Sequence, residues 1–440
     1  MSAPARLTGP DGEPIAAGAL SWRGVRLGSD LLARARRHAF RAGRVIARDG
    51  LEVLSWGVAA RIEFPRGAGE PAAAECAHEL LAAIPGGPDG ETAIRGPVAL
   101  GALPFDTSVP GSLVIAGTTI VVDGGTGAAV AVGPGPGSPD PWGKSPRDFA
   151  VPESDDRGDE AGPDRFRVDS VRPHDDFLAR VAAARAAIRA GDLAKVVLVR
   201  EVALRANQRF RQFDLLERLR ALHPTCAAFA IDGFVGASPE LLVRRRDRLI
   251  GSRPLAGTVA RSGDRSEDAR AAAELLASPK DRLEHRYVVE AIIATFARHA
   301  GDVAVPEKPE LLELRNVIHL ATPVSGTLHA VGPDGRLPSA LGLALELHPT
   351  PAVAGVPREA ALAYLDKAED LDRGRFAGPV GWFDASGDGE WWIGIRSAVV
   401  DGARARLFAG AGIVAASDPA TELAETQLKL QALLAAFVRP

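Results

Sequence analysis

Short apolar runs separated by Gly and Pro turns dominate the first third of the chain, which is typical of strands. The runs are Leu51–Trp56, Pro97–Leu100, Ser112–Ile115 and Thr119–Val122. One helix is expected around Pro71–Ile84, where apolar residues recur without such turns. We therefore predict a strand-rich N-terminal region over residues 1–132.

Residues 133–168 differ from the segments on either side of them. A Gly/Pro-rich stretch from Gly133 to Pro141 precedes the acidic stretch Glu153–Asp164. Neither stretch can bury enough apolar surface to offset the entropy lost on folding. We predict a linker or mobile loop over 133–168, followed by a catalytic region over 169–440.

The second half opens with a helical pattern. Four apolar residues recur at helical spacing, namely Phe177, Val181, Ala184 and Ile188, and Gly191 is placed to end the helix. Lys195–Leu204 then has the pattern of a buried strand, and three more extended segments follow at Ala227–Ile231, Glu240–Arg245 and Arg248–Pro254. Helices expected over 279–299, 357–369 and 419–437 alternate with strands over 378–384, 391–399 and 404–409. The pattern predicts an α/β (α+β) protein with large antiparallel sheets packed together and flanking helices.

Composition narrows the function classes. The chain has 440 residues and a net charge of −4, which argues against a nucleic-acid surface. Cys76 and Cys226 are its two cysteines, so there is no disulfide framework and no zinc motif. No signal peptide and no apolar run long enough to span a bilayer is visible. We expect a cytoplasmic protein without a membrane or nucleic-acid partner, and a monomer because no apolar stripe requires a second chain.

Two expected helix starts carry acidic residues in their first turns. Ser278 and Asp418 each precede a proline, which is a capping arrangement. Behind these caps lie four carboxylates at i, i+3 spacing: Asp281, Glu284, Glu422 and Glu425. Mg²⁺ takes one or two protein carboxylates and completes its shell with water and substrate oxygens, so these residues could form a magnesium site. Solvated charged faces, with Glu425 and Lys429 as an ordinary i, i+4 pair, are the alternative.

Lys195 and Glu240 are candidates for acid–base chemistry. Lys195 stands at the start of a buried strand, and Glu240 follows Ala-Ser-Pro at a turn into another strand. A lysine acts as a general base when desolvation makes a neutral amine available. The alternatives are a lysine that covers the end of a strand and a carboxylate at a strand end.

Two glycine-containing segments are candidates for contact with a ligand. Pro254–Thr258 offers glycine beside a hydroxyl, although an ordinary turn would have the same composition. Gly410-Ala-Gly412-Ile-Val-Ala415 formally matches a dinucleotide fingerprint, but it lacks both the helix that should follow and the acidic residue that should bind the ribose. We interpret it as a turn whose backbone donors face a carboxylate.

At these residues the chain resembles the chorismate-utilising enzymes, a family that includes isochorismate, salicylate, anthranilate and aminodeoxychorismate synthases. The resemblance covers about residues 172–437. The motifs that carry it are Lys195-Val-Val-Leu-Val-Arg, Ala-Ser-Pro-Glu240, Pro-Leu-Ala-Gly257-Thr258, Lys280-Asp-Arg-Leu-Glu284-His, His319-Leu-Ala-Thr, Ile395-Arg396, Gly410-Ala-Gly-Ile and Glu422-Leu-Ala-Glu425-Thr-Gln-Leu-Lys429. The resemblance implies the fold of that family and chorismate as substrate.

The resemblance also implies a role for each matching residue. Lys195 would deprotonate the water that attacks C2, and Glu240 would protonate the departing C4 hydroxyl. Mg²⁺ would be held by Glu284 and Glu425, with Asp281 and Glu422 in support. The residues that would contact the substrate are Gly257, Thr258, His319, Ile395, Arg396, Gly410 and Lys429.

Within the family, the residues favour an isochorismate synthase. The aminodeoxychorismate branch carries a lysine where this chain has Ala256, and ammonia-using members lack the lysine that Lys195 supplies, so no glutaminase subunit is expected. His319–Pro323 and Leu347–Ala352 look most like isochorismate synthases. A salicylate synthase, which goes on to eliminate pyruvate, and a non-catalytic chorismate-binding protein are the alternatives. The pathway served, whether menaquinone, siderophore or another, stays open.

Overall fold

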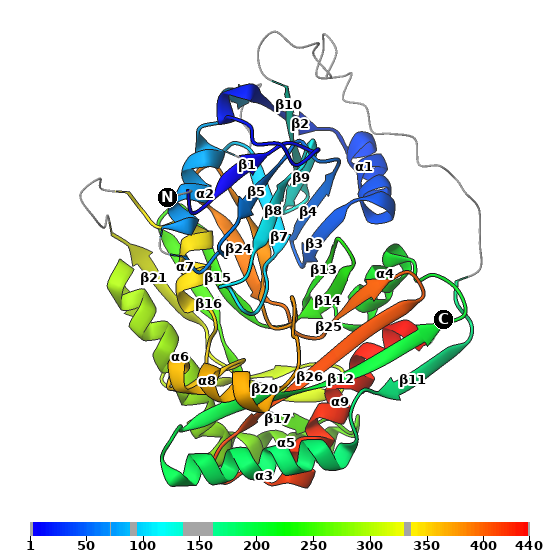
Figure 1. Cartoon of the computed structure of the whole chain (residues 1–440), viewed down its shortest axis with the longest axis vertical. Helices are drawn as coiled ribbons and strands as arrows, with labels where there is room; N and C mark the ends of the chain where they lie inside the picture. Colours follow the sequence, from blue (N-terminus) through cyan, green and yellow to red (C-terminus); the bar gives the residue numbers. More distant parts are fainter. Residues whose placement is uncertain (1–2, 71, 89–94, 135–161, 330–335, 439–440) are drawn as a thin grey trace.

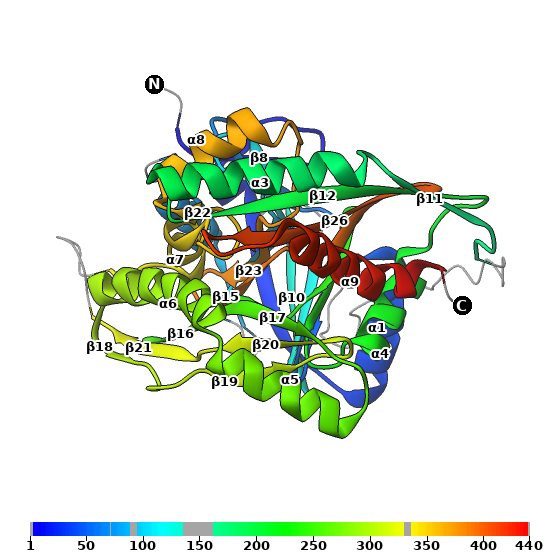
Figure 2. The same ribbon diagram turned by 90° about the horizontal axis from the view of Figure 1, so that it is seen from below.

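The computed structural model describes residues 3–70, 72–88, 95–134, 162–329 and 336–438. Two large sheets pack face to face, and a small third sheet lies below them with several helices (Figures 1 and 2). A single buried apolar cluster contains side chains of both large sheets, such as Leu100 and Val53. The predicted class, antiparallel sheets packed together with flanking helices, is confirmed.

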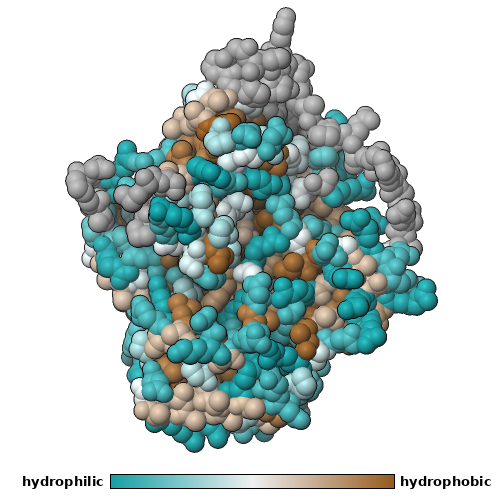
Figure 3. Space-filling view, in the orientation of Figure 1, coloured by the Kyte–Doolittle hydropathy of each residue, from teal (hydrophilic) through white to brown (hydrophobic). Residues whose placement is uncertain are grey.

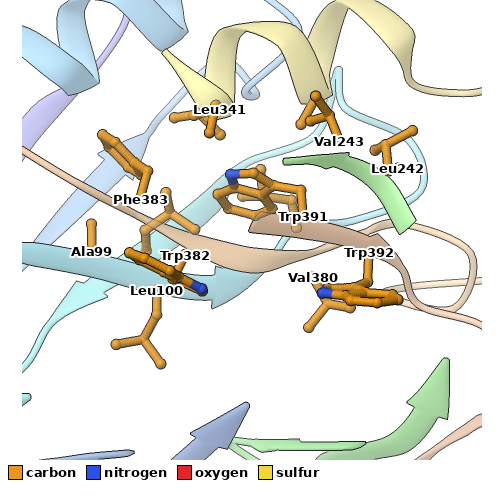
Figure 4. Packing of buried hydrophobic residues seen from close by; sticks show 14 of the residues in the cluster. Ala99, Leu100, Leu242, Val243, Leu341, Val380, Trp382, Phe383, Trp391 and Trp392 are labelled. Atoms are coloured by element: carbon orange, nitrogen blue, oxygen red, sulfur yellow. The ribbon is translucent and has the colours of Figure 1, made fainter. Parts of the chain in front are cut away.

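Sheet A is antiparallel throughout its described pairs. In spatial order its strands are β1 (Arg6–Thr8), β5 (Ala60–Phe64), β8 (Gly111–Ile115), β7 (Val98–Ala102), β23 (Pro379–Asp384), β24 (Gly389–Ile393), β15 (Leu241–Arg246), β16 (Leu249–Arg253), β21 (Val324–Leu328) and β18 (Ala300–Ala304). Its centre is aromatic, with Trp382, Phe383, Trp391 and Trp392 packed among aliphatic side chains (Figure 4).

Sheet B runs across the molecule and provides the strands nearest the site. In spatial order they are β11 (Phe166–Ser170), β12 (Lys195–Ala206), β26 (Arg404–Ile413), β25 (Ser397–Asp401), β14 (Phe234–Ser238), β13 (Ala227–Ile231), β3 (Arg44–Arg48), β4 (Leu51–Trp56), β9 (Thr118–Asp123), β10 (Thr126–Pro134), β2 (Leu20–Leu27) and β6 (Gly86–Pro88), with β22 (Gly355–Val356) paired to β12. The pair β2–β6 is parallel. The long antiparallel pair β12–β26 forms the side of the sheet beside the helices.

Sheet C and the helices complete the described structure. Sheet C consists of β17 (Leu255–Ala260), β20 (Val317–Ala321) and β19 (Glu310–Glu313). The helices are the short 3₁₀ helix η1 (Ala17–Ala19), α1 (Ser29–Ala42), α2 (Ala73–Ala82), α3 (His174–Ala190), α4 (Gln212–Leu222), α5 (Arg265–Ala277), α6 (Pro279–His299), α7 (Ala340–Leu347), α8 (Arg358–Ala368) and α9 (Pro419–Val438). Figure 2 shows α3 and α9 along β12 and β26, and α5 and α6 beside sheet C.

The expected helix signals behave as predicted. Ser278 accepts a hydrogen bond from the backbone N–H of Asp281 at 3.2 Å, and Asp418 accepts one from that of Thr421 at 2.9 Å. Both caps satisfy donors that the first turn of a helix leaves open. Gly191 ends α3 with a φ of 91°, a left-handed conformation that suits glycine. The acidic first turns of α6 and α9 are therefore held in place locally.

Strands from both ends of the chain are interleaved in both large sheets. In sheet A, β7 from the N-terminal part pairs with β23, and in sheet B, β3 pairs with β13. The N-terminal and catalytic regions that the sequence separates thus share one core. β10 ends at Pro134 and β11 begins at Phe166, so strands occupy both ends of the predicted linker 133–168. Its middle part, residues 135–161, lies outside the described residues.

Two details of the expected secondary structure are wrong. Helix α1 lies in a region expected to contain one other helix, although Leu32, Ala35 and Ala39 are buried at helical spacing. The strand expected over 391–399 is two strands, β24 in sheet A and β25 in sheet B, because the chain turns between them at Arg396 (φ 50°). The pairing of β24 with β15 and of β25 with β14 decides that break.

Two further corrections concern the glycine segments. Pro254–Thr258 is not a plain turn, since Leu255 begins strand β17 and a bulge occurs between Ala256 and Thr258. Gly410 and Gly412 lie within β26, paired with Val199 and Val197 of β12, and do not form a turn. In both cases pairing with a neighbouring strand makes the segment extended, and the sequence of the short segment alone does not reveal this pairing.

The described surface mixes polar and apolar side chains. On the face shown in Figure 3, hydrophobic residues occur between hydrophilic ones. The exposed large hydrophobic residues of the described chain are spread over it: Val109, Val168, Val171, Leu249, Leu276 and Val305. Among the described helices, none is long and apolar enough to cross a membrane. The monomeric state stays a prediction.

Candidate active site

A cavity lies where β12 and β26 of sheet B meet sheet C and helices α6 and α9; we call it the central cavity. It encloses about 760 Å³ of space, its open mouth included, which is in the range of small-molecule sites. Its polar lining consists of Glu240, Thr258, Glu284, His319, Arg373, Arg396, Glu425 and Lys429. Segments as far apart in the chain as Val197 and Lys429 are thus brought to one place.

Glu240 is buried in the wall of the central cavity, 3% exposed. The preceding turn is fixed because Ser238 donates its hydroxyl to the carbonyl of Ile393 at 2.6 Å. Burial raises the pKa of Glu240 to about 8, against the smaller opposing effects of a backbone hydrogen bond from Leu255 and the charges of Lys195 and Lys429. The carboxyl group is therefore protonated at neutral pH and can donate a proton.

Lys195 is completely buried at the start of β12, and its Nζ lies 3.0 Å from Oε1 of Glu284. The approach is a close contact of charges without hydrogen-bond alignment, since Nζ has no hydrogen-bond partner. Glu284 lines the central cavity, whereas Lys195 lies behind it. The amine that the sequence predicts as a base is therefore next to the cavity but not on its surface.

Gly412 makes room for this pair. A Cβ atom at position 412 would lie 2.0 Å from Oε1 of Glu284 and 3.0 Å from Cε of Lys195. The first distance is too short for any contact and the second is tight, so a side chain at this position would displace the Glu284 carboxylate from where it lies. The glycine-rich segment of β26 therefore allows the Glu284 carboxylate to lie close to the strand, and it is not a nucleotide-binding loop.

The four predicted carboxylates lie in the first two turns of α6 and α9. Glu284 and Glu425 line the central cavity, while Asp281 and Glu422 lie outside its lining. Burial, and then the charges of Glu284 and Glu425, raise the pKa of Asp281, despite its hydrogen bond from Ser278. Burial and the charge of Glu425 likewise raise the pKa of Glu422. The carboxylates are thus close enough to repel one another.

Lysines partly balance this negative charge. Lys280 contacts Glu422 at 2.7 Å, and Lys429 contacts Glu425 at 2.5 Å. Among the described residues no group of three or more His, Cys, Asp or Glu side chains is arranged as a metal cage. A divalent ion that takes two carboxylates and otherwise water or substrate oxygens, as Mg²⁺ does, fits Glu284 and Glu425. The mutual repulsion of the carboxylates is what such an ion would relieve.

His319, Thr258 and Arg396 form a hydrogen-bonded chain on the cavity wall. Arg396 donates from Nη2 to Nε2 of His319 at 3.0 Å, while Nδ1 lies 3.0 Å from the Thr258 hydroxyl and 3.2 Å from the carbonyl of Gly257. An arginine cannot accept, so Nε2 is the acceptor and the proton of the neutral ring is on Nδ1. Burial, then the charges of Arg396 and Lys429, hold the pKa of His319 well below its usual value.

Arg396 gives the central cavity a positive charge. It is 7% exposed and forms no ion pair with any described residue. Its left-handed backbone, φ 50°, lies at the crossing from sheet A to sheet B. Lys429, which also donates to the carbonyl of Gly410 at 2.8 Å, is the second cation on the wall. Arg396, a cation without an ion pair among the described residues, lies beside a protonated acid and a neutral histidine and favours an anionic ligand.

Ten of the thirteen predicted site residues line the central cavity. They are Glu240, Gly257, Thr258, Glu284, His319, Ile395, Arg396, Gly410, Glu425 and Lys429. Lys195, Asp281 and Glu422 lie behind this lining. The structure thus brings the predicted residues together, while their chemical roles stay predictions.

Arg373 is a lining residue that the sequence analysis missed. It is buried, pairs with Glu369 at 2.6 Å and donates to the carbonyls of Val353 and Val197, both at 2.8 Å. Glu369 in turn accepts the backbone N–H of Val199 at 2.8 Å. The pair fixes the loop after α8 against β12. Its i, i+4 spacing looks like an exposed helical pair, so the sequence contained no signal that distinguished it.

Comparison with known proteins agrees with this geometry. A family model of chorismate binding enzymes matches residues 150–438. The salicylate biosynthesis isochorismate synthase of Pseudomonas aeruginosa is 43% identical over 58% of this chain and 53% of its own length. Isochorismate synthase EntC of Escherichia coli K12 is 36% identical over 78% of this chain and 82% of its own. The solved structure of DhbC from Bacillus anthracis is 31% identical, with a TM-score of 0.76, over 92% of this chain and 98% of that one.

Proposed function

The chain belongs to the chorismate binding enzyme family, and we propose that it converts chorismate into isochorismate. The observation that carries the proposal is Glu240, a carboxylic acid with a pKa of about 8, in the same cavity as Arg396 and Lys429. Chorismate is a dicarboxylate that must lose a hydroxyl group during this reaction. Cations that hold its carboxylates and an acid that protonates the departing oxygen are what the reaction requires.

The proposed reaction is an exchange of hydroxyl groups. Water adds to C2 as Lys195 takes its proton, the ring double bonds shift, and the C4 hydroxyl leaves as water with the proton of Glu240. One water enters and one leaves, so the result is an isomerisation. The proton on Lys195 and the one lost by Glu240 are exchanged with solvent before the next turnover.

The assignment of Lys195 as the base is less direct than that of Glu240 as the acid. Its amine does not line the central cavity, and its contact is with Glu284, which does. The assignment is supported by its complete burial and by its place one layer behind the cavity wall. For Lys195 to act, the Glu284 side chain must shift so that water reaches Nζ.

We propose that Mg²⁺ is held by Glu284 and Glu425, with Asp281 and Glu422 in support. When bound, the ion would neutralise and fix a substrate carboxylate. Arg396 and Lys429 would hold the carboxylates from the protein side, and His319 would keep the Arg396 guanidinium in place. Gly257, Thr258 and Ile395 would shape the wall around the ring, and Gly410 would position Lys429 through its carbonyl.

Product analysis tests the function. Purified protein is incubated with chorismate and Mg²⁺, with and without EDTA, and the products are separated by chromatography. Isochorismate as the product is the expected result. Salicylate with pyruvate would identify a salicylate synthase, and tight chorismate binding without any product would identify a binding protein; either result contradicts the proposal.

A further inference from the structure

A second cavity lies on the other side of the segment Val199–Arg200, next to α3; we call it the α3 cavity. It encloses about 670 Å³, mouth included, and is lined by β12, the first part of α3, Arg406 of β26 and the loop after α8. Figure 2 shows α3 alongside β12, where this cavity lies. Val199 lines both cavities, so the two are separated by a single strand.

The most buried cation of the α3 cavity is Arg200. It is 5% exposed, and its side-chain hydrogen bond goes to a neutral group, the hydroxyl of Thr426 on α9, at 2.9 Å. Among the described residues, no carboxylate lies within ion-pair distance of it. Burial and the charge of Arg180 lower the pKa of Arg200. A buried cation without a counter-ion is costly, so its presence calls for an explanation.

Arg180 adds a second guanidinium group beside the first. The Cζ atoms of Arg200 and Arg180 lie 5.6 and 5.7 Å from the ring centre of Phe177. Arg180 contacts Asp176 at 3.0 Å through Nε, but its buried Nη1 has no hydrogen-bond partner. Both guanidinium groups thus lie against the same ring, and of the two only that of Arg180 contacts a carboxylate of the described residues.

The other arginines of the α3 cavity are neutralised. Arg406 pairs with Glu201 at 2.6 Å, and Arg172 pairs with Asp370. Arg200 is therefore the arginine of the α3 cavity that contacts no carboxylate among the described residues. Asp370 and Asp372 also line the cavity, and their charges disfavour a large polyanion.

We propose that the α3 cavity binds a small oxyanion, a phosphate or carboxylate group, between Arg180 and Arg200. A guanidinium group presents forked N–H donors that match the oxygens of either group. The anion would supply the missing counter-charge and a partner for Nη1 of Arg180. This site is separate from the central cavity and does not depend on the proposed function.

The choice of variant follows from the second contact of Arg200. Because Arg200 also bonds Thr426, the neighbour of Glu425, changing Arg200 would disturb α9 as well as the anion. Arg180→Gln removes one guanidinium group and leaves Arg200 in place. Arg189→Gln is the matched control, since Arg189 lies on the same helix and donates to the carbonyl of Ala415 outside the α3 cavity.

The experiment measures the melting temperature of the full chain against phosphate and, separately, malonate, with NaCl holding the ionic strength constant. We expect a saturable rise in wild type, an apparent affinity about tenfold or more weaker in Arg180→Gln, and no change in Arg189→Gln. The tighter of the two anions identifies the group that the site prefers. An equal response in all three proteins would place the anion elsewhere and overturn the proposal.

A direct measurement covers the case in which Arg180→Gln does not fold. Crystals of the wild-type protein are soaked in selenate, whose anomalous signal marks the oxyanion. A peak between Arg180 and Arg200 supports the site. Peaks confined to the central cavity, or no peak in the α3 cavity, overturn it.

Discussion

The Nη2 of Arg396 lies 3.0 Å from the Nε2 of His319, and this hydrogen bond decides which nitrogen of the ring carries the proton. Because arginine can only donate, the histidine acts there as an acceptor. His319 is therefore a positioning residue that holds a guanidinium group, and a general-base role at Nε2 is excluded while the bond lasts.

This relationship predicts the effect of changing His319. His319→Ala should raise KM for chorismate about tenfold or more, since a hydrogen bond to a charged group contributes about 1.5–3 kcal/mol. His319→Gln, which offers a carbonyl oxygen to Arg396, should recover part of the loss. Steady-state kinetics of both variants test this. A fall in kcat with unchanged KM would instead indicate a chemical role for the ring.

The raised pKa of Glu240 predicts how kcat depends on pH. Its pKa of about 8 means that the acid form, which donates the proton, is lost as the pH rises through about 8, so kcat should fall there. Glu240→Gln should reduce kcat by about 10²–10⁴-fold, as expected for loss of a general acid. The measurement is kcat between pH 6 and 10. A kcat that stays constant up to pH 10 would contradict the assignment.

The raised pKa of Glu240 also predicts how the free energy of unfolding changes with pH. A pKa raised in the folded state gives stability that is complete below the unfolded value, near 4.3, and is lost as the pH rises through about 8. Glu240→Gln lacks this titration, so its free energy of unfolding should fall less than that of wild type between pH 5 and 8. Urea unfolding at several pH values checks this, and parallel curves for the two proteins would count against it.

Lys195→Ala should abolish conversion while chorismate binding is largely kept. It should also destabilise the fold, because it leaves Glu284 without its partner. Turnover, calorimetric binding of chorismate and the melting temperature are measured together, so that unfolding is not mistaken for loss of chemistry. A folded variant with wild-type turnover would refute the role of Lys195 as a base.

Glu284→Gln should sharply raise the Mg²⁺ concentration needed for half-maximal activity and reduce the stabilisation of the protein by Mg²⁺. Glu290→Gln is the matched control, because Glu290 is an exposed carboxylate on the same helix. Activity and melting temperature are titrated with Mg²⁺ in both variants. The same metal dependence in Glu284→Gln and wild type would remove Glu284 from the proposed metal site.

Gly412→Ala should reduce kcat about tenfold or more while the protein stays folded. The new Cβ would lie 2.0 Å from Oε1 of Glu284 and displace that carboxylate, and misplaced groups of this kind lower rates strongly. Gly251→Ala, in strand β16, is the control, since its Cβ would meet nothing closer than 3.7 Å. Equal activity of the two variants would show that the contact at position 412 does not matter.

Several site residues could be predicted because short-range signals locate them. The caps at Ser278 and Asp418 set where α6 and α9 begin, and thus which carboxylates occupy their first turns. Lys195 stands at the start of β12 as expected, and Glu240 comes directly before β15. These features depend on interactions within a few residues, which the local sequence contains.

Other features had no local signal. The segment Trp391–Val399 is predicted as one strand, yet it divides between two sheets at Arg396. The ion pair of Arg373 and Glu369 has the spacing of an exposed helical pair, yet it is buried against β12. In both cases distant strands decide the outcome, and their positions are not encoded in the neighbouring residues.

By itself, the sequence determined where the main helices begin, which segments extend, and which residues resemble those of a chorismate-utilising enzyme. The tertiary structure alone decided that Lys195 lies behind Glu284, that Gly412 must be small for that contact, and that Arg200 is buried without a carboxylate. Helix caps and the spacing of apolar residues depend on interactions between residues that are close in sequence. Burial and ion pairing arise only when distant strands pair, as β12 does with β26. These long-range contacts determine how deeply a charged side chain is buried, and therefore how it can react.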